Sequence, residues 1–352
     1  MSASVFDHPW LNGLFDAPDI APLWQAEAQA AHLIAYERAW TEALFASVRI
    51  SEGASREALR AIHNWKPDTK TLLEGTARDG LVVPTLVAQL RKDLGDPKAI
   101  HSGSTSQDVL DTALVLTLRA VTNVLTHDLS ALCAALDTRI GMDGEKRLVG
   151  RTRMQAALPI AVSHRLEQWR QPLSTLHGEA DTLIKTLALQ IGGAVGDGQA
   201  LGDDAKQINA FVADRLGLPL PAASWHSDRG CLVRYSDWLT RIAGALGKIG
   251  QDITLMAQQG LDEITLKGGG GSSAMPHKQN PVLAELLVTL ARFTAGQNGI
   301  MGQALIHEQE RSGTAWALEW MVLPQMTMAT GCATHSALKL LDSITGIGTP
   351  AR

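Results

Sequence analysis

Three segments of the sequence gather polar and charged side chains between long apolar stretches. The first is HSGSTSQD at residues 101–108, which supplies hydroxyl groups, an amide and Asp108 just before an apolar stripe. Thr105 and Asp108 have the spacing of a capping box. The first N–H groups of a helix attract a carboxylate or a phosphate. An ordinary helix cap has the same pattern, so this segment alone leaves both interpretations open.

The second segment is GRTRMQAALP at residues 150–159, which we place just before a helix. It holds Arg151, Thr152, Arg153 and Gln155 close together. Two arginines can bind a polycarboxylate through paired hydrogen bonds. A solvated turn has the same composition, and the residues do not decide between the two.

The third segment is GGGGSSAMPHKQNP at residues 268–281. Its four glycines indicate a mobile loop, and it is not a phosphate-binding loop, because no Gly-Lys-Ser/Thr ends it. A flexible linker is the alternative, but the residues after the glycines favour a lid loop that brings a serine and a lysine to a bound anion. Two tryptophans, Trp316 and Trp320, are candidates for a pocket near Arg311, whereas Trp10, Trp24, Trp40 and Trp65 are expected in the core.

Long helices must position these segments. Apolar residues repeat every three or four positions from Leu110 to Ile140, which predicts one helix of over thirty residues. A second seam from Leu239 to Met256 predicts a partner helix. Strand-like alternation is not sustained, so we expect an all-α protein. We place a small N-terminal helical domain at residues 1–101, a long-helix bundle at 102–346 and a tail at 347–352.

Composition narrows the class of protein. The formal net charge of −5 speaks against a general nucleic-acid binder. No apolar run is long enough to predict a membrane span, and no HExxH or GxGxxG motif indicates a metal or dinucleotide site. Three isolated cysteines point to a reducing cytoplasm. Only 19% of residues are charged, which favours an oligomer over a monomer with a large core.

The three segments, in this order, resemble the signature regions of the fumarase/aspartase superfamily. GSSAMPHKQNP at residues 271–281 is similar to the superfamily loop GSSxMPxKxNP. The resemblance implies an all-α fold, a central bundle formed in a homotetramer, active sites built from three subunits, and no cofactor. Many members continue into a small C-terminal helical domain, which we expect to be absent because the sequence stops at Arg352.

Within the superfamily, HSGSTSQDVLDTA at 101–113 and HEQERSGTAWALEW at 307–320 resemble the 3-carboxy-cis,cis-muconate cycloisomerases. This subfamily forms a carboxymuconolactone through an aci-carboxylate intermediate in the protocatechuate branch of the β-ketoadipate pathway. The alternatives are a lyase that releases fumarate from a succinyl adduct such as adenylosuccinate, and an inactive oligomeric scaffold. Lyases usually carry a histidine where this sequence has Arg153, which weighs against the lyase and suggests an Arg153–Glu285 ion pair.

The resemblance also implies roles for individual residues. Ser272 is expected to be the acid that protonates carbon, and Lys278 to stabilise the intermediate. The substrate is expected to be a small tricarboxylate, with neither nucleic acid nor membrane as a partner, in the cytoplasm. The residues expected to bind this substrate are Thr105, Ser106, Gln107, Thr152, Arg153, Gln155, Ser273, Asn280 and Arg311.

Overall fold

Long helices dominate the computed structural model, which describes residues 4–271, 275 and 278–350. The elements in chain order are α1 (Asn12–Phe15), η1 (Ala21–Trp24), α2 (Ala26–Ala46), α3 (Glu52–Asn64), α4 (Thr69–Asp79), α5 (Val83–Arg91), η2 (Pro97–Ala99), α6 (Ser106–Asp143), β1 (Arg147–Thr152), β2 (Gln155–Ala161), α7 (Val162–Thr186), η3 (Gln199–Asp204), α8 (Ala205–Leu216), α9 (Gly230–Met256), β3 (Ile264–Leu266), α10 (Val282–Gln303), α11 (Gly313–Ser343) and β4 (Ile344–Ile347).

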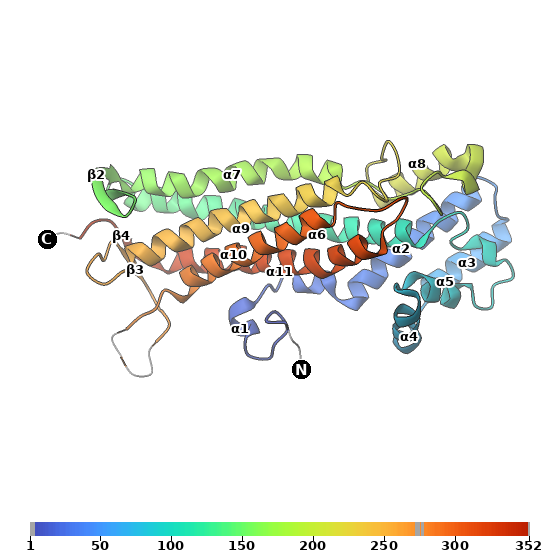
Figure 1. The fold of residues 1–352 in the computed structure, drawn as a ribbon, viewed down its shortest axis with the longest axis horizontal. Coiled ribbons are helices and arrows are strands. Elements are labelled where there is room, and N and C mark those ends of the chain that lie inside the picture. The colour runs from blue at the N-terminus through green and yellow to red at the C-terminus, as the bar shows by residue number, and fades with distance from the viewer. Residues whose placement is uncertain (1–3, 272–274, 276–277, 351–352) are drawn as a thin grey trace.

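Five helices, α6, α7, α9, α10 and α11, run side by side along the molecule as an elongated bundle (Figure 1). Helix α10 packs against α9 and α11, and α6 packs against α7 and α11. The shorter helices α2 to α5 lie at the end of the bundle where α6 begins. The all-α fold class predicted from the sequence is confirmed. The boundaries at residues 101 and 346 stay predictions.

The single helix expected from the apolar stripe is α6, which has 38 residues. Leu118, Leu125 and Leu129 from the stripe are fully buried. The helix begins with the expected capping box. The Thr105 side chain accepts a hydrogen bond from the backbone N–H of Asp108, and the Asp108 side chain accepts one from the backbone N–H of Thr105. By length and composition, α6 is the one helix in the described part of the chain that could cross a membrane, but 61% of its most apolar window is buried in the fold.

Two prolines of the described chain lie well inside long helices, where proline is normally unfavourable. Helix α7 continues through Pro172 and α11 through Pro324. Proline removes one backbone hydrogen bond and crowds the preceding turn. Both helices bury residues beyond the proline, such as Leu176 and Met328, so tertiary packing outweighs this local cost.

The segment at residues 147–161 folds as an antiparallel β-hairpin, which the sequence analysis did not predict. Arg153 and Met154 form its two-residue turn, with φ of 49° and 66°. Positive φ at both central positions is the geometry of a type I′ hairpin turn. Almost all of β2 is exposed, so no buried face imposed an alternating pattern on the sequence. A second small sheet pairs β3 with β4.

Glycines allow α9 and α10 to pack closely. A Cβ on Gly250 would lie 2.4 Å from the carbonyl oxygen of Ala284 in α10, and one on Gly247 would lie 2.5 Å from Cβ of Ala291. Gly244, on the same helix, has no described atom within 4 Å of its Cβ position apart from its chain neighbours and the backbone of its own helix.

We therefore predict that Gly250→Ala lowers the free energy of unfolding by about 1–3 kcal/mol, because the backbones must separate to admit the methyl group. The matched control is Gly244→Ala, which should leave stability unchanged or raise it, since alanine is the better helix former. Urea unfolding followed by circular dichroism measures both. Equal unfolding midpoints for the two variants would contradict this packing.

Candidate active site

The N-terminus of α6 lies at one end of the bundle, where the first N–H groups of the helix have no backbone partner within it. Thr105 is the N-cap and Ser106 the first helical residue. The backbone N–H of Thr105 donates to Asp108 Oδ2 at 3.0 Å. Ser106 is only partly buried, so its hydroxyl and the first turn of the helix form a surface that suits a carboxylate.

Arg311 reaches this helix end from the segment between α10 and α11. Its Nε donates to Gln107 Oε1 at 2.8 Å, and its Nη2 donates to Thr105 Oγ1 at 3.2 Å and to the carbonyl oxygen of Ala194 at 3.2 Å. The fold thus brings together four of the residues expected to bind substrate, which are Thr105, Ser106, Gln107 and Arg311. A fixed cation beside a helix N-terminus is an arrangement that binds anions.

A glycine-rich segment at residues 191–202 borders the same place, and the sequence analysis overlooked it. The N–H of Gly193 donates to Asp108 Oδ2 at 3.0 Å. Gly193, Gly196 and Gly198 all have positive φ, between 67° and 87°, which favours glycine. Five glycines in twelve residues were the available signal.

A buried ion cluster lies beneath Arg311. Arg229 is fully buried and donates to two carboxylates, Asp111 at 2.7 and 3.0 Å and Glu319 at 2.6 and 2.7 Å. These residues come from α6, from the N-terminal end of α9 and from α11. One guanidinium therefore joins three helices of the bundle.

Further hydrogen bonds connect this cluster to the surface site. Gln107 Nε2 donates to Asp111 Oδ2 at 3.2 Å while its Oε1 accepts from Arg311. Trp316 Nε1 donates to Asp111 Oδ1 at 2.9 Å, so this tryptophan, expected to line a pocket, is a buried support instead. Burial alone would raise the pKa of Asp111, but the charge of Arg229 and the hydrogen bonds outweigh it and hold that pKa below its usual range.

Two buried histidines, also missed from the sequence, flank these carboxylates. His226 Nε2 lies 2.8 Å from Asp108 Oδ1, and His226 is 3% exposed. His307 Nε2 lies 3.6 Å from Glu319 Oε1, and its side chain is fully buried. Among the described residues, no group of three or more His, Cys, Asp or Glu side chains is arranged to hold a metal ion.

The second segment lies at the other end of the bundle, on the β1–β2 hairpin (Figure 1). Thr152, Arg153 and Gln155 are exposed there. Arg151 is bound instead to Glu263, whose side chain is 4% exposed, at 2.7 Å, so the two arginines do not form a clamp in this chain. Within the described part of one chain, Arg153 and Glu285 form no ion pair, and the proposed pairing stays a prediction for an assembly.

The third segment follows β3 at the same end as the hairpin. Asn280 and Gly270 exchange two backbone hydrogen bonds of 3.0 Å that close the base of this loop. Lys278 is exposed. Ser272 and Ser273, which carry the acid and a binding role in our prediction, lie outside the described residues.

The length of α6 separates the first segment from the second. Thr105 caps the start of this helix and β1 begins just after its end. At 1.5 Å per residue, 38 residues span roughly 57 Å. The first and second segments of one chain are therefore too far apart to contact one small substrate.

We predict that Arg229→Leu destabilises the fold by about 3–5 kcal/mol at neutral pH, because two buried carboxylates lose their cation. The matched control is Arg241→Leu, which breaks an exposed pair with Glu179 and should cost about 0–1 kcal/mol. Thermal unfolding at pH 5 and pH 8 gives the readout. The Arg229 variant should be more stable at pH 5, where unpaired buried carboxylates take up protons; a variant insensitive to pH would contradict an electrostatic role.

Comparison with known proteins identifies the family of the chain. The model of a lyase family matches residues 21–296, which is more than half of the chain. The 3-carboxy-cis,cis-muconate cycloisomerase of Pseudomonas aeruginosa is 36% identical over 287 residues, 79% of this chain and 62% of that protein. The enzyme of the same name from Bradyrhizobium diazoefficiens is 34% identical and is covered to 63% of its length. The chain thus spans less than two thirds of the length of these two relatives.

Solved structures extend the likeness to the whole fold. The 3-carboxy-cis,cis-muconate lactonizing enzyme of Pseudomonas putida superimposes with a TM-score of 0.88 at 30% identity, over 96% of this chain and 77% of that one. The sequence motifs, the helical bundle and the matched family model agree. The chain belongs to the lyase family, and 3-carboxy-cis,cis-muconate cycloisomerases are among its relatives.

Proposed function

We propose that this protein is a cycloisomerase that converts 3-carboxy-cis,cis-muconate to a carboxymuconolactone. The observation that carries the proposal is the place of Arg311, which Gln107 and Thr105 hold beside the N-terminus of α6. A tricarboxylate needs fixed positive charge and unspent donors, and this corner of the fold supplies both. The names of the relatives supply the substrate.

The reaction requires stabilisation of negative charge more than it requires redox chemistry. A carboxylate oxygen of the substrate adds to a carbon of the conjugated diene and forms the C–O bond of the lactone. The π electrons move onto another carboxylate, which gives an aci-carboxylate, and a proton then adds to the α-carbon. The trianion takes up one proton and becomes a dianionic lactone. Donors fixed around the aci-carboxylate lower the barrier most.

Each segment has a proposed part in this chemistry. Thr105, Ser106, Gln107 and Arg311 bind substrate carboxylates at one helix end. Thr152, Arg153 and Gln155 of the hairpin bind the remaining carboxylates, and Ser273 and Asn280 of the third segment assist. Ser272 supplies the proton, and Lys278 stabilises the intermediate. Arg153 in place of the lyase histidine favours this reaction over fumarate release.

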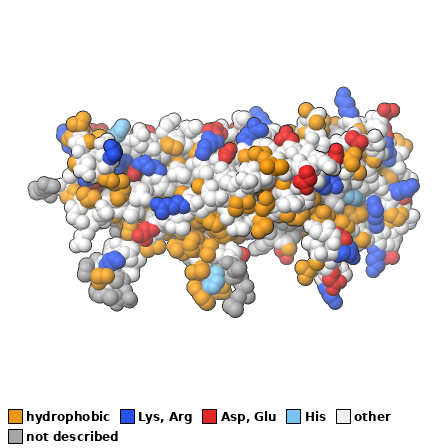
Figure 2. Space-filling view, viewed as in Figure 1, with side chains coloured by type: hydrophobic (Ala, Val, Ile, Leu, Met, Phe, Trp, Pro, Cys, Tyr) orange, Lys and Arg blue, Asp and Glu red, His pale blue; other side chains and the backbone are white. Residues whose placement is uncertain are grey.

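A site of this kind must combine segments from several copies, so we propose a homotetramer with shared active sites. The separation along α6 supports the sharing. The surface area supports an assembly as well. The chain of 37.7 kDa exposes 17605 Å², whereas a compact monomer of this mass exposes about 13,800 Å². Large apolar side chains such as Ile306 and Met321 are 75% and 64% exposed, and apolar groups gather along one visible face (Figure 2).

The proposed setting is the protocatechuate branch of the β-ketoadipate pathway, in the cytoplasm. Cys133, Cys231 and Cys332 are all free thiols, which fits a reducing compartment.

The direct test mixes the purified protein with 3-carboxy-cis,cis-muconate, without added metal or nucleotide, and follows the diene absorbance. We expect the absorbance to fall and a lactone to be seen by NMR, because cyclisation removes one double bond from conjugation. A folded protein that leaves the diene unchanged would contradict the cycloisomerase, and adenylosuccinate and argininosuccinate would then be assayed.

Active sites that are shared between copies of the chain lead to a second prediction. Arg311→Ala and Ser272→Ala should each lose most turnover, but a refolded equal mixture should regain roughly a quarter of the wild-type rate, because each site draws the two segments from different copies of a symmetric oligomer. The matched control mixes Arg311→Ala with Thr105→Ala. These residues contact each other within one chain, so every site keeps a lesion and no recovery is expected. A first mixture that stays inactive would show that the segments do not combine across copies.

A further inference from the structure

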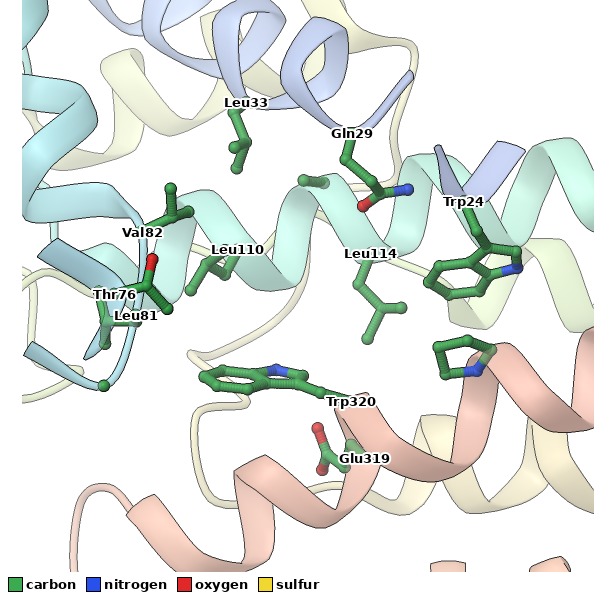
Figure 3. A pocket seen from close by; sticks show the side chains of 13 residues that line it. Trp24, Gln29, Leu33, Thr76, Leu81, Val82, Leu110, Leu114, Glu319 and Trp320 are labelled. Carbon is green, nitrogen blue, oxygen red and sulfur yellow. The ribbon is translucent and has the colours of Figure 1, made fainter. Parts of the chain in front are cut away.

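An apolar cavity of about 350 Å³ lies between the N-terminal helices and the bundle (Figure 3). Leu110 and Leu114 of α6 point into it, and the ring of Trp320 from α11 closes the opposite side. Trp24 stands at one end, and the α4–α5 turn with Leu81 and Val82 stands at the other.

Four polar side chains at this cavity, those of Glu319, Gln29, Thr76 and Trp24, make hydrogen bonds within the fold. Both oxygens of Glu319 accept from Arg229. The Nε2 of Gln29 donates to the carbonyl oxygen of Leu23 and to Thr117, and Thr76 Oγ1 donates to the carbonyl oxygen of Leu72. The indole N–H of Trp24 donates to Thr327. Among the described residues, no lysine or arginine lines the cavity, so the cavity favours apolar groups over charged ones.

In the part of the chain that the structure describes, the cavity begins one turn along α6 from the candidate carboxylate site, whose own residues do not line it. Ser106, Leu110, Ala113 and Leu114 are spaced by four, three and one residues, and side chains three or four apart on a helix are neighbours. Leu110, at the cavity wall, therefore lies one turn from Ser106. Leu110 also lies at the end of the cavity nearest the start of α6, beside Leu81 and Val82.

We propose that this cavity is a second subsite, which binds the apolar part of a ligand whose carboxylates are held at Arg311 and the N-terminus of α6. The inference rests on the carboxylate site of the proposed function. The volume of the cavity is sufficient for a phenyl ring, because an apolar cavity of about 150 Å³ already accommodates benzene. The two tryptophan rings supply flat apolar walls of the kind that line small-molecule pockets.

The consequence is a wider substrate class than small polycarboxylates. A di- or tricarboxylate that carries a phenyl or branched alkyl group places its anionic end at Arg311 and its apolar group at the end of the cavity that Leu110 lines. A carboxylate without such a group leaves the cavity unfilled. The same face of α6 thus favours a ligand that carries both carboxylates and an apolar group.

The test compares two ligands that share their carboxylates, succinate and 2-benzylsuccinate, by isothermal titration into the full-length protein. Burial of a phenyl ring should make 2-benzylsuccinate bind at least about tenfold more tightly. Equal affinities would overturn the proposal, as they would if another copy of the chain filled the cavity.

A variant tests whether the phenyl group of 2-benzylsuccinate binds in the cavity. Leu114→Trp should fill the cavity, so we expect the advantage of 2-benzylsuccinate to disappear while succinate binds as before. The matched control is Leu73→Trp, at a residue of α4 that is 71% exposed and does not line the cavity, and it should keep the full advantage. An advantage that survives Leu114→Trp would place the phenyl group elsewhere and overturn the assignment.

These outcomes are separable from those of the proposed function. Failure of both ligands to bind would overturn the two-part site, whereas the diene assay reports on the cycloisomerase independently. Turnover of 3-carboxy-cis,cis-muconate together with equal affinities for the two succinates would keep the enzyme and remove the apolar subsite.

Discussion

The buried guanidinium of Arg229 is the interaction on which the rest of the structure depends. It satisfies Asp111 of α6 and Glu319 of α11 from the start of α9. Two buried carboxylates without a cation would be costly, and a buried cation without them equally so. The cluster therefore fixes the relative position of three long helices at the end of the bundle where the candidate site lies.

Hydrogen bonds connect the same cluster to the candidate site. Asp111 holds Gln107, and Gln107 holds Arg311. The candidate carboxylate site is thus supported by a chain of hydrogen bonds that begins in the core and ends at Arg311. On the other side, Glu319 borders the apolar cavity with both oxygens satisfied. The same buried ion cluster is thus hydrogen-bonded to the candidate carboxylate site and borders the apolar cavity.

Helix length is the second constraint. A rigid helix of 38 residues places the first and second segments at opposite ends of the molecule. Chemistry that needs both must come from more than one copy, and the long apolar bundle offers the surface for such an assembly. The candidate site and the proposed oligomer are therefore consequences of a single element.

Local patterns in the sequence predicted the long apolar helices and the resemblance to the family. Periodic leucines from Leu110 to Ile140 and the Thr105–Asp108 spacing depend on local geometry, which is readable from neighbours three or four residues apart. Two features could not be predicted from local patterns. Tertiary packing keeps α7 and α11 helical through Pro172 and Pro324. The hairpin around Arg153 is exposed, so its strands show no alternation of apolar and polar residues. Trp10, expected in the core, is 75% exposed. The contacts of Arg229 with Asp111 and Glu319 could not be predicted from the sequence, because residues 111, 229 and 319 meet across the bundle and share no spacing along the chain.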